Sequence, residues 1–347
     1  MAVSDSNPRS STVLRYPLPS YVDGVRWISS LSPLEKLFLV SSISTDTHTP
    51  SLDIYSISND SNTSKPQISS SWVPPSRVTS LASAPSLFAA STLSGTLHFF
   101  TTPSTSELLP VATVEQADPS FHIGSISSVG LRDGGGECCV TVGHDGGINV
   151  QAIGEGSAVS RRVFDGSGLV SYTAVNWASG NEFVTGGVGV GLQWWDMRHQ
   201  GSPVSQLKDI WDKGKESGII HSVDVHPSRK HACLAGGSSG TVVAWDLRWP
   251  KQPVFLASEN SGSRSVSNSE IWEVQFTKSC SSNASSSQLL PAMICSEDGI
   301  LAVLEQGKDA VELLTEPCAI NSFDIHWSNS LDIVCCLEWE SIALLSR

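Results

Sequence analysis

Positive charge is scarce in this sequence. Lysine and arginine together number 21 against 34 aspartates and glutamates, so the formal net charge is −13 at pH 7. Binding to nucleic-acid phosphates or to an anionic membrane surface needs clustered lysine and arginine, and the sequence contains no compact cluster of this kind. We therefore expect no nucleic-acid partner and favour protein partners with basic or apolar surfaces.

Long apolar runs are also absent. No stretch of about 18 apolar residues occurs, which excludes a transmembrane helix, so we expect no direct membrane insertion. Residues 1–12 are polar and lack the apolar core of a secretory signal peptide.

The residue patterns of metal sites and enzymes are missing as well. The eight cysteines include no C-x-x-C pair or zinc-type spacing, which indicates buried, reduced thiols of a cytosolic or nuclear protein. His221, His226 and His231 are spaced so that successive rings fall on opposite faces of a strand, which argues against a metal site. The Gly-x-Ser-x-Gly match at 236–240 falls in a turn between two expected strands, whereas a nucleophile elbow leads from a strand into a helix. Strands rather than helices also follow the glycine-rich runs at 134–136 and 186–191. We expect no catalytic residue, no cofactor and no enzymatic activity.

What the sequence does contain is a pattern repeated seven times: an apolar residue, two others, a second apolar residue, one other, and a third that is usually apolar. The copies begin at Val22, Val78, Ile126, Tyr172, Ile220, Ile271 and Ile320. The alternation is typical of a half-buried strand, and a period of about 50 residues indicates a repeat architecture. Each unit is too short to bury its own apolar face, so the sequence predicts one closed all-β domain over residues 12–347.

Behind each first strand come a second apolar stretch, a turn and a third strand. In the clearest copy the turn at 236–240 is rich in glycine, which fits a hairpin that needs positive φ. Polar stretches separate the copies, and we expect exposed, mobile loops there. These stretches span residues 56–71, 102–120, 200–218, 258–269 and 279–287.

The last copy stops at its third strand, residues 341–345, so its outer strand is missing. The segment 12–16 is apolar enough to supply it, and we predict that this segment pairs with the last strand and closes the ring. Closure removes an open strand edge, which is an aggregation hazard. Residues 1–11 are expected to form a flexible tail.

Two copies end in the pattern Trp-Asp-x-Arg. The residues are Trp195, Asp196 and Arg198 in one copy and Trp245, Asp246 and Arg248 in the other. Together with the seven aligned copies, they resemble WD40 repeats, and the resemblance implies a seven-bladed β-propeller. In a structural interpretation the tryptophan packs between blades while the aspartate and arginine hold the strand end. In a functional interpretation Arg198 and Arg248 dock on the adaptor of a cullin-4 ubiquitin ligase, since the tetrapeptide resembles the motif of such WD40 proteins.

Trp272 is a further candidate interaction residue. It lies between Ile271 and Val274, out of phase with the apolar face of its strand. Two interpretations stay open: an anchor on the rim or in the channel of the ring, or an aromatic packed at a blade junction.

Several segments in order resemble the WD40-repeat nucleoporins of the nucleoporin 43 family. They span residues 192–198, 219–227, 271–276, 295–299 and 320–325. The resemblance implies a non-enzymatic scaffold subunit of the Y-shaped complex in the nuclear pore, at the nuclear envelope. It also implies docking on α-helical solenoid nucleoporins of the short arm of that complex, in support of protein and mRNA transport.

Two alternative functions remain. One is a substrate receptor of a cullin-4 type ligase, and the other is a propeller whose channel reads an extended basic peptide. The sequence departs from the WD40 pattern in the first, second, third and sixth copies, which lack Trp-Asp. The residues that contact partners are not a sequence motif in this family, so none is assigned from the resemblance.

Overall fold

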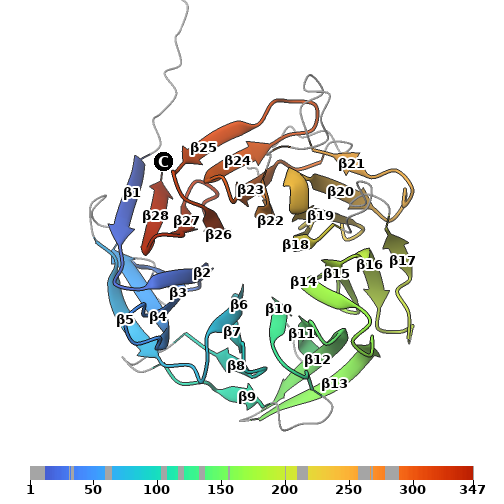
Figure 1. Cartoon of the computed structure of the whole chain (residues 1–347), viewed down its shortest axis with the longest axis horizontal. Helices are drawn as coiled ribbons and strands as arrows, with labels where there is room; N and C mark the ends of the chain where they lie inside the picture. The colour runs from blue at the N-terminus through green and yellow to red at the C-terminus, as the bar shows by residue number, and fades with distance from the viewer. Residues whose placement is uncertain are drawn as a thin grey trace, which may run out of the picture.

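The chain forms a closed ring of seven four-stranded antiparallel sheets, the blades, around a central channel (Figure 1). The computed structural model describes residues 12–30, 32, 35–58, 65–102, 108–115, 121–132, 137–154, 157–199, 201–208, 218–256, 266, 269–277 and 289–346. Within these residues the only helical element is a three-residue 3₁₀ turn, η1 (Ser238–Gly240). The predicted all-β, seven-bladed propeller is confirmed.

In each blade the first strand lies innermost (Figure 1). Blade 1 consists of β2 (Tyr21–Ile28), β3 (Glu35–Ile43), β4 (Pro50–Ser58) and β5 (Gln67–Trp72). Blade 2 consists of β6 (Val78–Ala84), β7 (Leu87–Thr92), β8 (Leu97–Phe100) and β9 (Ala112–Val114). Blade 3 consists of β10 (Ile126–Leu131), β11 (Glu137–Gly143), β12 (Gly147–Gly154) and β13 (Ser157–Asp165). Blade 4 consists of β14 (Ser171–Trp177), β15 (Glu182–Val188), β16 (Gly191–Asp196) and β17 (Ser205–Leu207).

The remaining blades follow in the same order around the ring. Blade 5 consists of β18 (Ile220–Val225), β19 (Ala232–Gly237), β20 (Val242–Asp246) and β21 (Val254–Phe255). Blade 6 consists of β22 (Ile271–Phe276), β23 (Ala292–Ser296), β24 (Ile300–Leu304) and β25 (Val311–Thr315). Blade 7 consists of β26 (Ile320–Ile325), β27 (Ile333–Leu337), β28 (Ser341–Ser346) and β1 (Thr12–Pro17).

Blade 7 therefore takes its outer strand from the other end of the sequence, as predicted. β1 pairs antiparallel with β28 along its full length. Val13 packs on the core between blades 6 and 7, while Tyr16 and Leu18 pack on the core between blades 7 and 1. The predicted flexible tail, residues 1–11, lies outside the described residues.

The apolar core of the protein lies between the blades. The described residues form seven clusters of buried side chains, one at each interface of neighbouring blades. Trp195 stacks on Phe183 with ring centroids 6.1 Å apart in the cluster between blades 3 and 4. Trp194 and Trp245 meet edge to face at 6.3 Å between blades 4 and 5. Because each blade gives its two faces to two different clusters, every blade depends on both neighbours.

Every inner strand contains a β-bulge at the same point of the repeat. In β22 the register shifts between Ile271 and Glu273, so Trp272 lies in the bulge. Equivalent shifts follow Val22, Val78, Ile126, Tyr172, Ile220 and Ile320. The extra residue explains the two-residue gap in the sequence pattern, because it returns the next apolar side chain to the buried side.

The hairpin turns between the second and third strands of blades 2 to 6 contain glycine with positive φ, as expected. These glycines are Gly95, Gly146, Gly189, Gly191, Gly240 and Gly299. The corresponding turn of blade 7 has no glycine, and Glu340 itself adopts a φ of 54°. That left-handed conformation costs a non-glycine residue about 1 kcal/mol.

The prediction of loops at 56–71, 102–120 and 200–218 is wrong in part. β5, β9 and β17 lie in these stretches and form the outermost strands of blades 1, 2 and 4. These strands were not recognised in the sequence because they are rich in polar residues, which the outer edge of a blade tolerates since it meets water. Residues 258–265, 267, 268 and 279–287 of the remaining two stretches lie outside the described residues.

The seven cysteines in the described part of the chain are buried and free, which agrees with the expectation of reduced thiols. Cys280 lies outside it. Across the described ranges, the structure has no helix long and apolar enough to cross a membrane.

Candidate protein-interaction site

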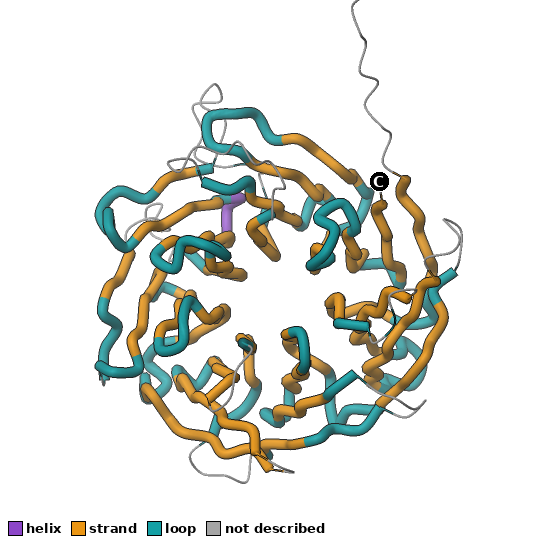
Figure 2. The backbone as a smooth tube through the Cα atoms, turned by 180° about the vertical axis from the view of Figure 1, so that it is seen from behind, coloured by secondary structure: helices purple, strands orange, loops and turns teal. Residues whose placement is uncertain are grey.

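The two faces of the ring differ in the elements that they expose, and Figures 1 and 2 view the ring from its two sides. The top face carries the beginnings of the inner strands and the turns between second and third strands. In blade 6, for example, the backbone amide of Glu297 in the β23–β24 turn donates to the carbonyl of Glu270, just before β22, at 3.0 Å. The bottom face carries the ends of the inner strands and the turns between third and outer strands.

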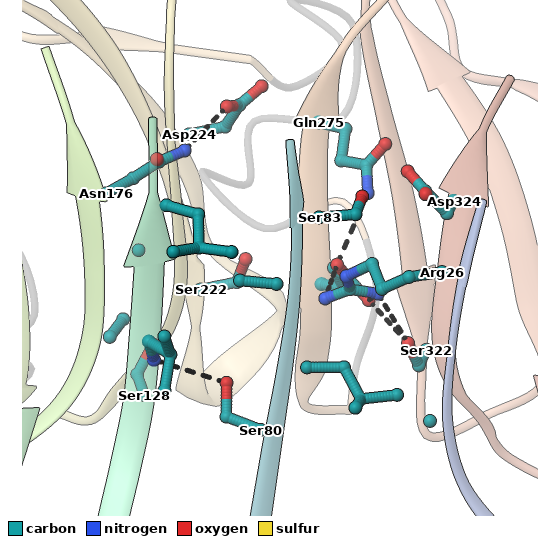
Figure 3. Close-up of a pocket in the computed structure, with 18 of the residues that line it drawn as sticks. Arg26, Ser80, Ser83, Ser128, Asn176, Ser222, Asp224, Gln275, Ser322 and Asp324 are labelled. Atoms are coloured by element: carbon teal, nitrogen blue, oxygen red, sulfur yellow. Dashed lines mark hydrogen bonds and ion pairs between the residues drawn. The ribbon is translucent and has the colours of Figure 1, made fainter. Parts of the chain in front are cut away.

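The inner strands line a channel of about 580 Å³ (Figure 3). One ring of channel residues follows the bulges and consists of Gly24, Ser80, Ser128, Ala174, Ser222, Glu273 and Ser322. The hydroxyls of Ser80, Ser128 and Ser222 each accept a hydrogen bond from a backbone amide of the next blade, at 3.2 Å. Side chains of one blade thus complete the backbone hydrogen bonds of its neighbour.

The bulge residues form a second ring of channel side chains, nearer the top face. They are Asp23, Thr79, Ser127, Thr173, His221, Trp272 and Asn321. All of them except Trp272 hydrogen-bond to the next blade. The pairs are Asp23 with Arg77, Thr79 with Ile126, Ser127 with Tyr172, Thr173 with Ile220, His221 with Glu270, and Asn321 with Tyr21. Trp272 differs, because its indole N–H donates to Glu297 of its own blade at 2.5 Å.

The position of Trp272 matches both interpretations that the sequence left open. It lines the channel, and it also packs on the core between blades 6 and 7. Its ring tilts against His221 of blade 5, with centroids 4.7 Å apart, and His221 in turn hydrogen-bonds to Glu270 at 2.6 Å. An indole, an imidazole and two carboxylates therefore meet at the top of the channel.

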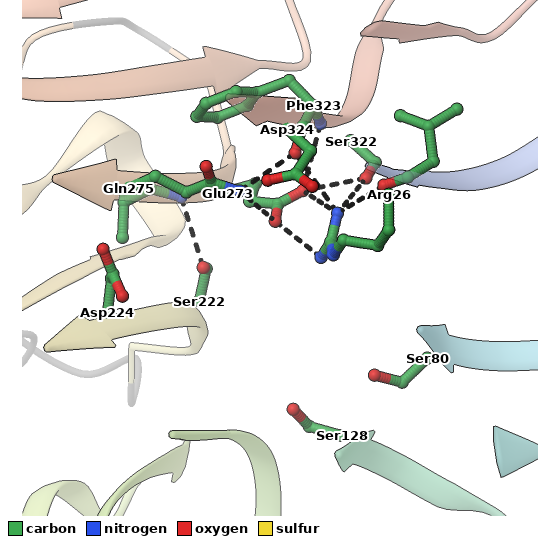
Figure 4. Close-up of polar contacts among 12 residues, drawn as sticks. Arg26, Ser80, Ser128, Ser222, Asp224, Glu273, Gln275, Ser322, Phe323 and Asp324 are labelled. Atoms are coloured by element: carbon green, nitrogen blue, oxygen red, sulfur yellow. Dashed lines mark hydrogen bonds and ion pairs between the residues drawn. The ribbon is translucent and has the colours of Figure 1, made fainter. Parts of the chain in front are cut away.

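Below this cluster lies an ion pair that joins three blades (Figure 4). Arg26 of blade 1 contacts Glu273 of blade 6, with 2.6 Å between Nη2 and Oε1. The second oxygen of Glu273 accepts hydrogen bonds from the Ser322 hydroxyl at 2.8 Å and the Phe323 amide at 3.1 Å, both in blade 7. Sequence reasoning missed this pair. The available signal was that Glu273 interrupts a row of small residues in the aligned repeats.

Two aspartates deeper in the channel wall also link blades. Asp224 accepts a hydrogen bond from the Phe276 amide at 2.7 Å, and Asp324 accepts one from the Trp27 amide at 2.8 Å. Burial raises the pKa of each aspartate to about 6, and the amide contacts offset only part of that effect. Sequence reasoning missed these residues too.

The two Trp-Asp-x-Arg motifs lie on the bottom face of blades 4 and 5. The Arg198 side chain donates to both oxygens of Asp196, at 2.9 and 2.6 Å, and its backbone amide donates at 3.0 Å. Arg248 and Asp246 repeat this arrangement. These contacts hold the pKa of Asp196 at about 2, with hydrogen bonds from Arg198 as the leading cause. The side chains of Arg198 and Arg248 are 65% and 58% exposed, so each guanidinium also faces water.

The three histidines that suggested a metal site do not converge. His221 lies in the channel wall, while His226 is buried and its Nδ1 accepts the Arg229 amide at 3.0 Å. His231 lies exposed just before β19. Among the residues that the structure describes, no group of three or more His, Cys, Asp or Glu is placed to hold a metal ion.

Comparison with known proteins identifies the family. No family model matches the chain. The chain is 49% identical to the nuclear pore complex protein NUP43 of Arabidopsis thaliana over 97% of its own length and 98% of that protein. It is also 32% and 31% identical to the nucleoporins Nup43 of mouse and human, over 50% of this chain and 40% of theirs. The chain belongs to the Nup43 family of nuclear pore complex proteins.

Proposed function

We propose that the chain is a structural subunit of the nuclear pore complex at the nuclear envelope, and that it acts by binding proteins rather than by catalysis. Its partners are α-helical solenoid nucleoporins of the short arm of the Y-shaped scaffold, and through them it supports transport of protein and mRNA. The observation that carries this proposal is the 49% identity, over nearly all of both chains, to a nuclear pore complex protein.

The architecture supports a scaffold role on physical grounds. Seven inter-blade cores and a closing strand give a ring whose faces keep their shape. The charged groups of the channel are engaged with neighbouring blades, as the Arg26 and Glu273 pair illustrates. Their contacts account for them as structural links between blades.

The test is affinity purification of the tagged protein from its own cells, followed by mass spectrometry. We expect helical nucleoporins of the outer ring in near-equal amounts with the tagged chain. Recovery of a cullin adaptor without nucleoporins would overturn the proposal and make the ligase alternative the better one. Recovery of histones or basic peptides would instead favour the peptide-reading alternative.

A further inference from the structure

Exposed apolar side chains occur at several points of the top face. They are Leu93 (56% exposed), Ile123 (80%), Leu169 (89%), Val188 (40%) and Trp339 (65%). Val188 ends β15, and each of the others lies in a turn between second and third strands or in the connection that leads to an inner strand. The bottom face also exposes large apolar side chains, among them Val204, Trp249 and Trp327, so apolar exposure alone does not distinguish the two faces.

The top face of blades 6 and 7, where Trp339 lies, carries negative charge. We call this region the acidic arc, and it consists of Glu270, Glu297, Asp298, Glu338 and Glu340. Glu297 accepts the Trp272 indole N–H, Glu338 accepts the Ala319 amide, and Glu340 accepts the Thr45 hydroxyl. These partners are neutral, so they leave the negative charge of the three carboxylates in place.

Two tryptophans frame the acidic arc. Trp272 lies at the mouth of the channel in blade 6, and Trp339 occupies the β27–β28 turn of blade 7. Tryptophan beside carboxylates suits lysine and arginine, whose aliphatic stems pack on the ring while the charged end reaches the oxygens. Aromatic side chains of this kind often contribute most to binding energy in protein interfaces.

We infer that the top face of blades 6 and 7 is the docking surface for a lysine- and arginine-rich segment of a protein partner, with an apolar part of that segment packed on Trp339. A basic segment is assigned as the occupant because its charge is complementary to that of the acidic arc. That the protein carrying this segment is a helical nucleoporin rests on the proposed function. The basic segment lies over Glu297, Asp298 and Glu340, and Trp339 packs against it.

Two matched pairs of variants test the inference. Glu297→Lys with Asp298→Lys reverses charge on the top face of blade 6, whereas Glu305→Lys with Asp309→Lys does so in the bottom-face turn of the same blade. Trp339→Ala on the top face is matched by Trp249→Ala on the bottom face, because both side chains are 65% exposed. Thermal unfolding of each variant checks that the fold is retained.

The readout is the amount of each identified partner that co-purifies from the protein's own cells, followed by the dissociation constant for the purified helical partner. We expect the top-face variants to weaken binding by about tenfold or more and the bottom-face variants by less than about twofold. We also expect added salt to weaken the wild-type complex more than the charge-reversed one. Equal losses for both faces, or losses confined to the bottom face, overturn the inference.

The same experiment separates the failure of the inference from the failure of the proposed function. If nucleoporins co-purify equally with wild type and top-face variants, the surface is wrong and the proposed function stands. If other identified proteins replace nucleoporins and are lost only with top-face variants, the surface stands and the proposed function fails. If those proteins are retained by the top-face variants, both fail.

Discussion

The top face of blades 6 and 7 and the bottom face of blades 4 and 5 use carboxylates in opposite ways. On the bottom face, Asp196 and Asp246 are each held by an arginine two residues away. On the top face, Glu297 and Glu340 contact neutral hydrogen-bond donors. The comparison teaches that Asp196 and Asp246 are compensated within their own turns, whereas the contacts of Glu297 and Glu340 leave their negative charge in place.

The channel wall between these two faces shows how the ring is held. Its charged residues join segments that are far apart in the sequence, as Arg26 and Glu273 do. A contact within one turn has little effect on closure, whereas a contact between distant blades closes the ring. Stability is therefore expected to depend most on the distant contacts.

The largest expected effect comes from removing the most distant contact, the pairing of β1 with β28. Deleting residues 1–18 removes β1 and the packing of Val13, Tyr16 and Leu18 on two cores. We expect the melting temperature to fall by about 10 °C or more, since several kcal/mol of apolar burial are lost. Deleting residues 1–9 is the control and leaves β1 intact. Equal melting temperatures for the two truncations contradict ring closure by β1.

The second-largest loss of stability is expected when an inter-blade carboxylate is neutralised, and a bottom-face carboxylate provides the comparison. Glu273→Gln leaves Arg26 without its ionic partner in the channel wall, and breaking a buried pair costs about 3 kcal/mol. Asp246→Asn weakens a solvent-exposed pair and is expected to cost far less. Chemical denaturation of both variants provides the measurement. A larger loss for Asp246→Asn would reverse the ranking of the two regions.

A third test uses pH and the raised pKa of Asp324. Its pKa rises from 3.8 to about 6 on folding because of burial, so the folded state binds the proton more tightly than the unfolded chain. The stabilisation is complete below about pH 4 and is lost as pH rises through about 6. Asp324→Asn cannot ionise.

The free energy of unfolding of wild type minus that of Asp324→Asn is therefore expected to fall by about 2 to 3 kcal/mol between pH 4 and pH 7. Arg26 and Glu273 face Asp324 in both proteins. Contributions from titrating groups that do not interact with Asp324, such as His98, largely cancel in the difference, whereas that of Asp224 does not, because, in addition to burial, the charge of Asp324 raises the pKa of Asp224. A difference that does not change with pH would show that Asp324 ionises as it does in water.

The smallest effect is expected at the bottom-face arginines. Arg198→Ala with Arg248→Ala removes two exposed guanidinium groups, and exposed ion pairs add little to stability. We expect an unchanged melting temperature and unchanged recovery of nucleoporins. Loss of a cullin adaptor in this variant, with the fold retained, would instead support the ligase alternative.

The fold could be predicted from the sequence because the spacing of apolar residues in each repeat follows from the geometry of the inner strand. The spacing from Ile271 to Val274 and Phe276 records a bulge followed by a buried face, and the apolar segment 12–16 revealed the closing strand. The outer strands β5, β9 and β17 were not recognised, because a blade edge in water tolerates polar residues. The contacts of Glu273 were not predictable either, since its partners lie in other blades and no local pattern marks them.

The most direct measurement is zero-length carbodiimide cross-linking of the complex purified from the protein's own cells, which joins carboxylates to contacting lysines. We predict that partner lysines are joined to Glu297, Asp298 and Glu340 on the top face. Joining of partner lysines to Glu305 and Asp309 on the bottom face, with none on the acidic arc, would contradict the proposed docking surface.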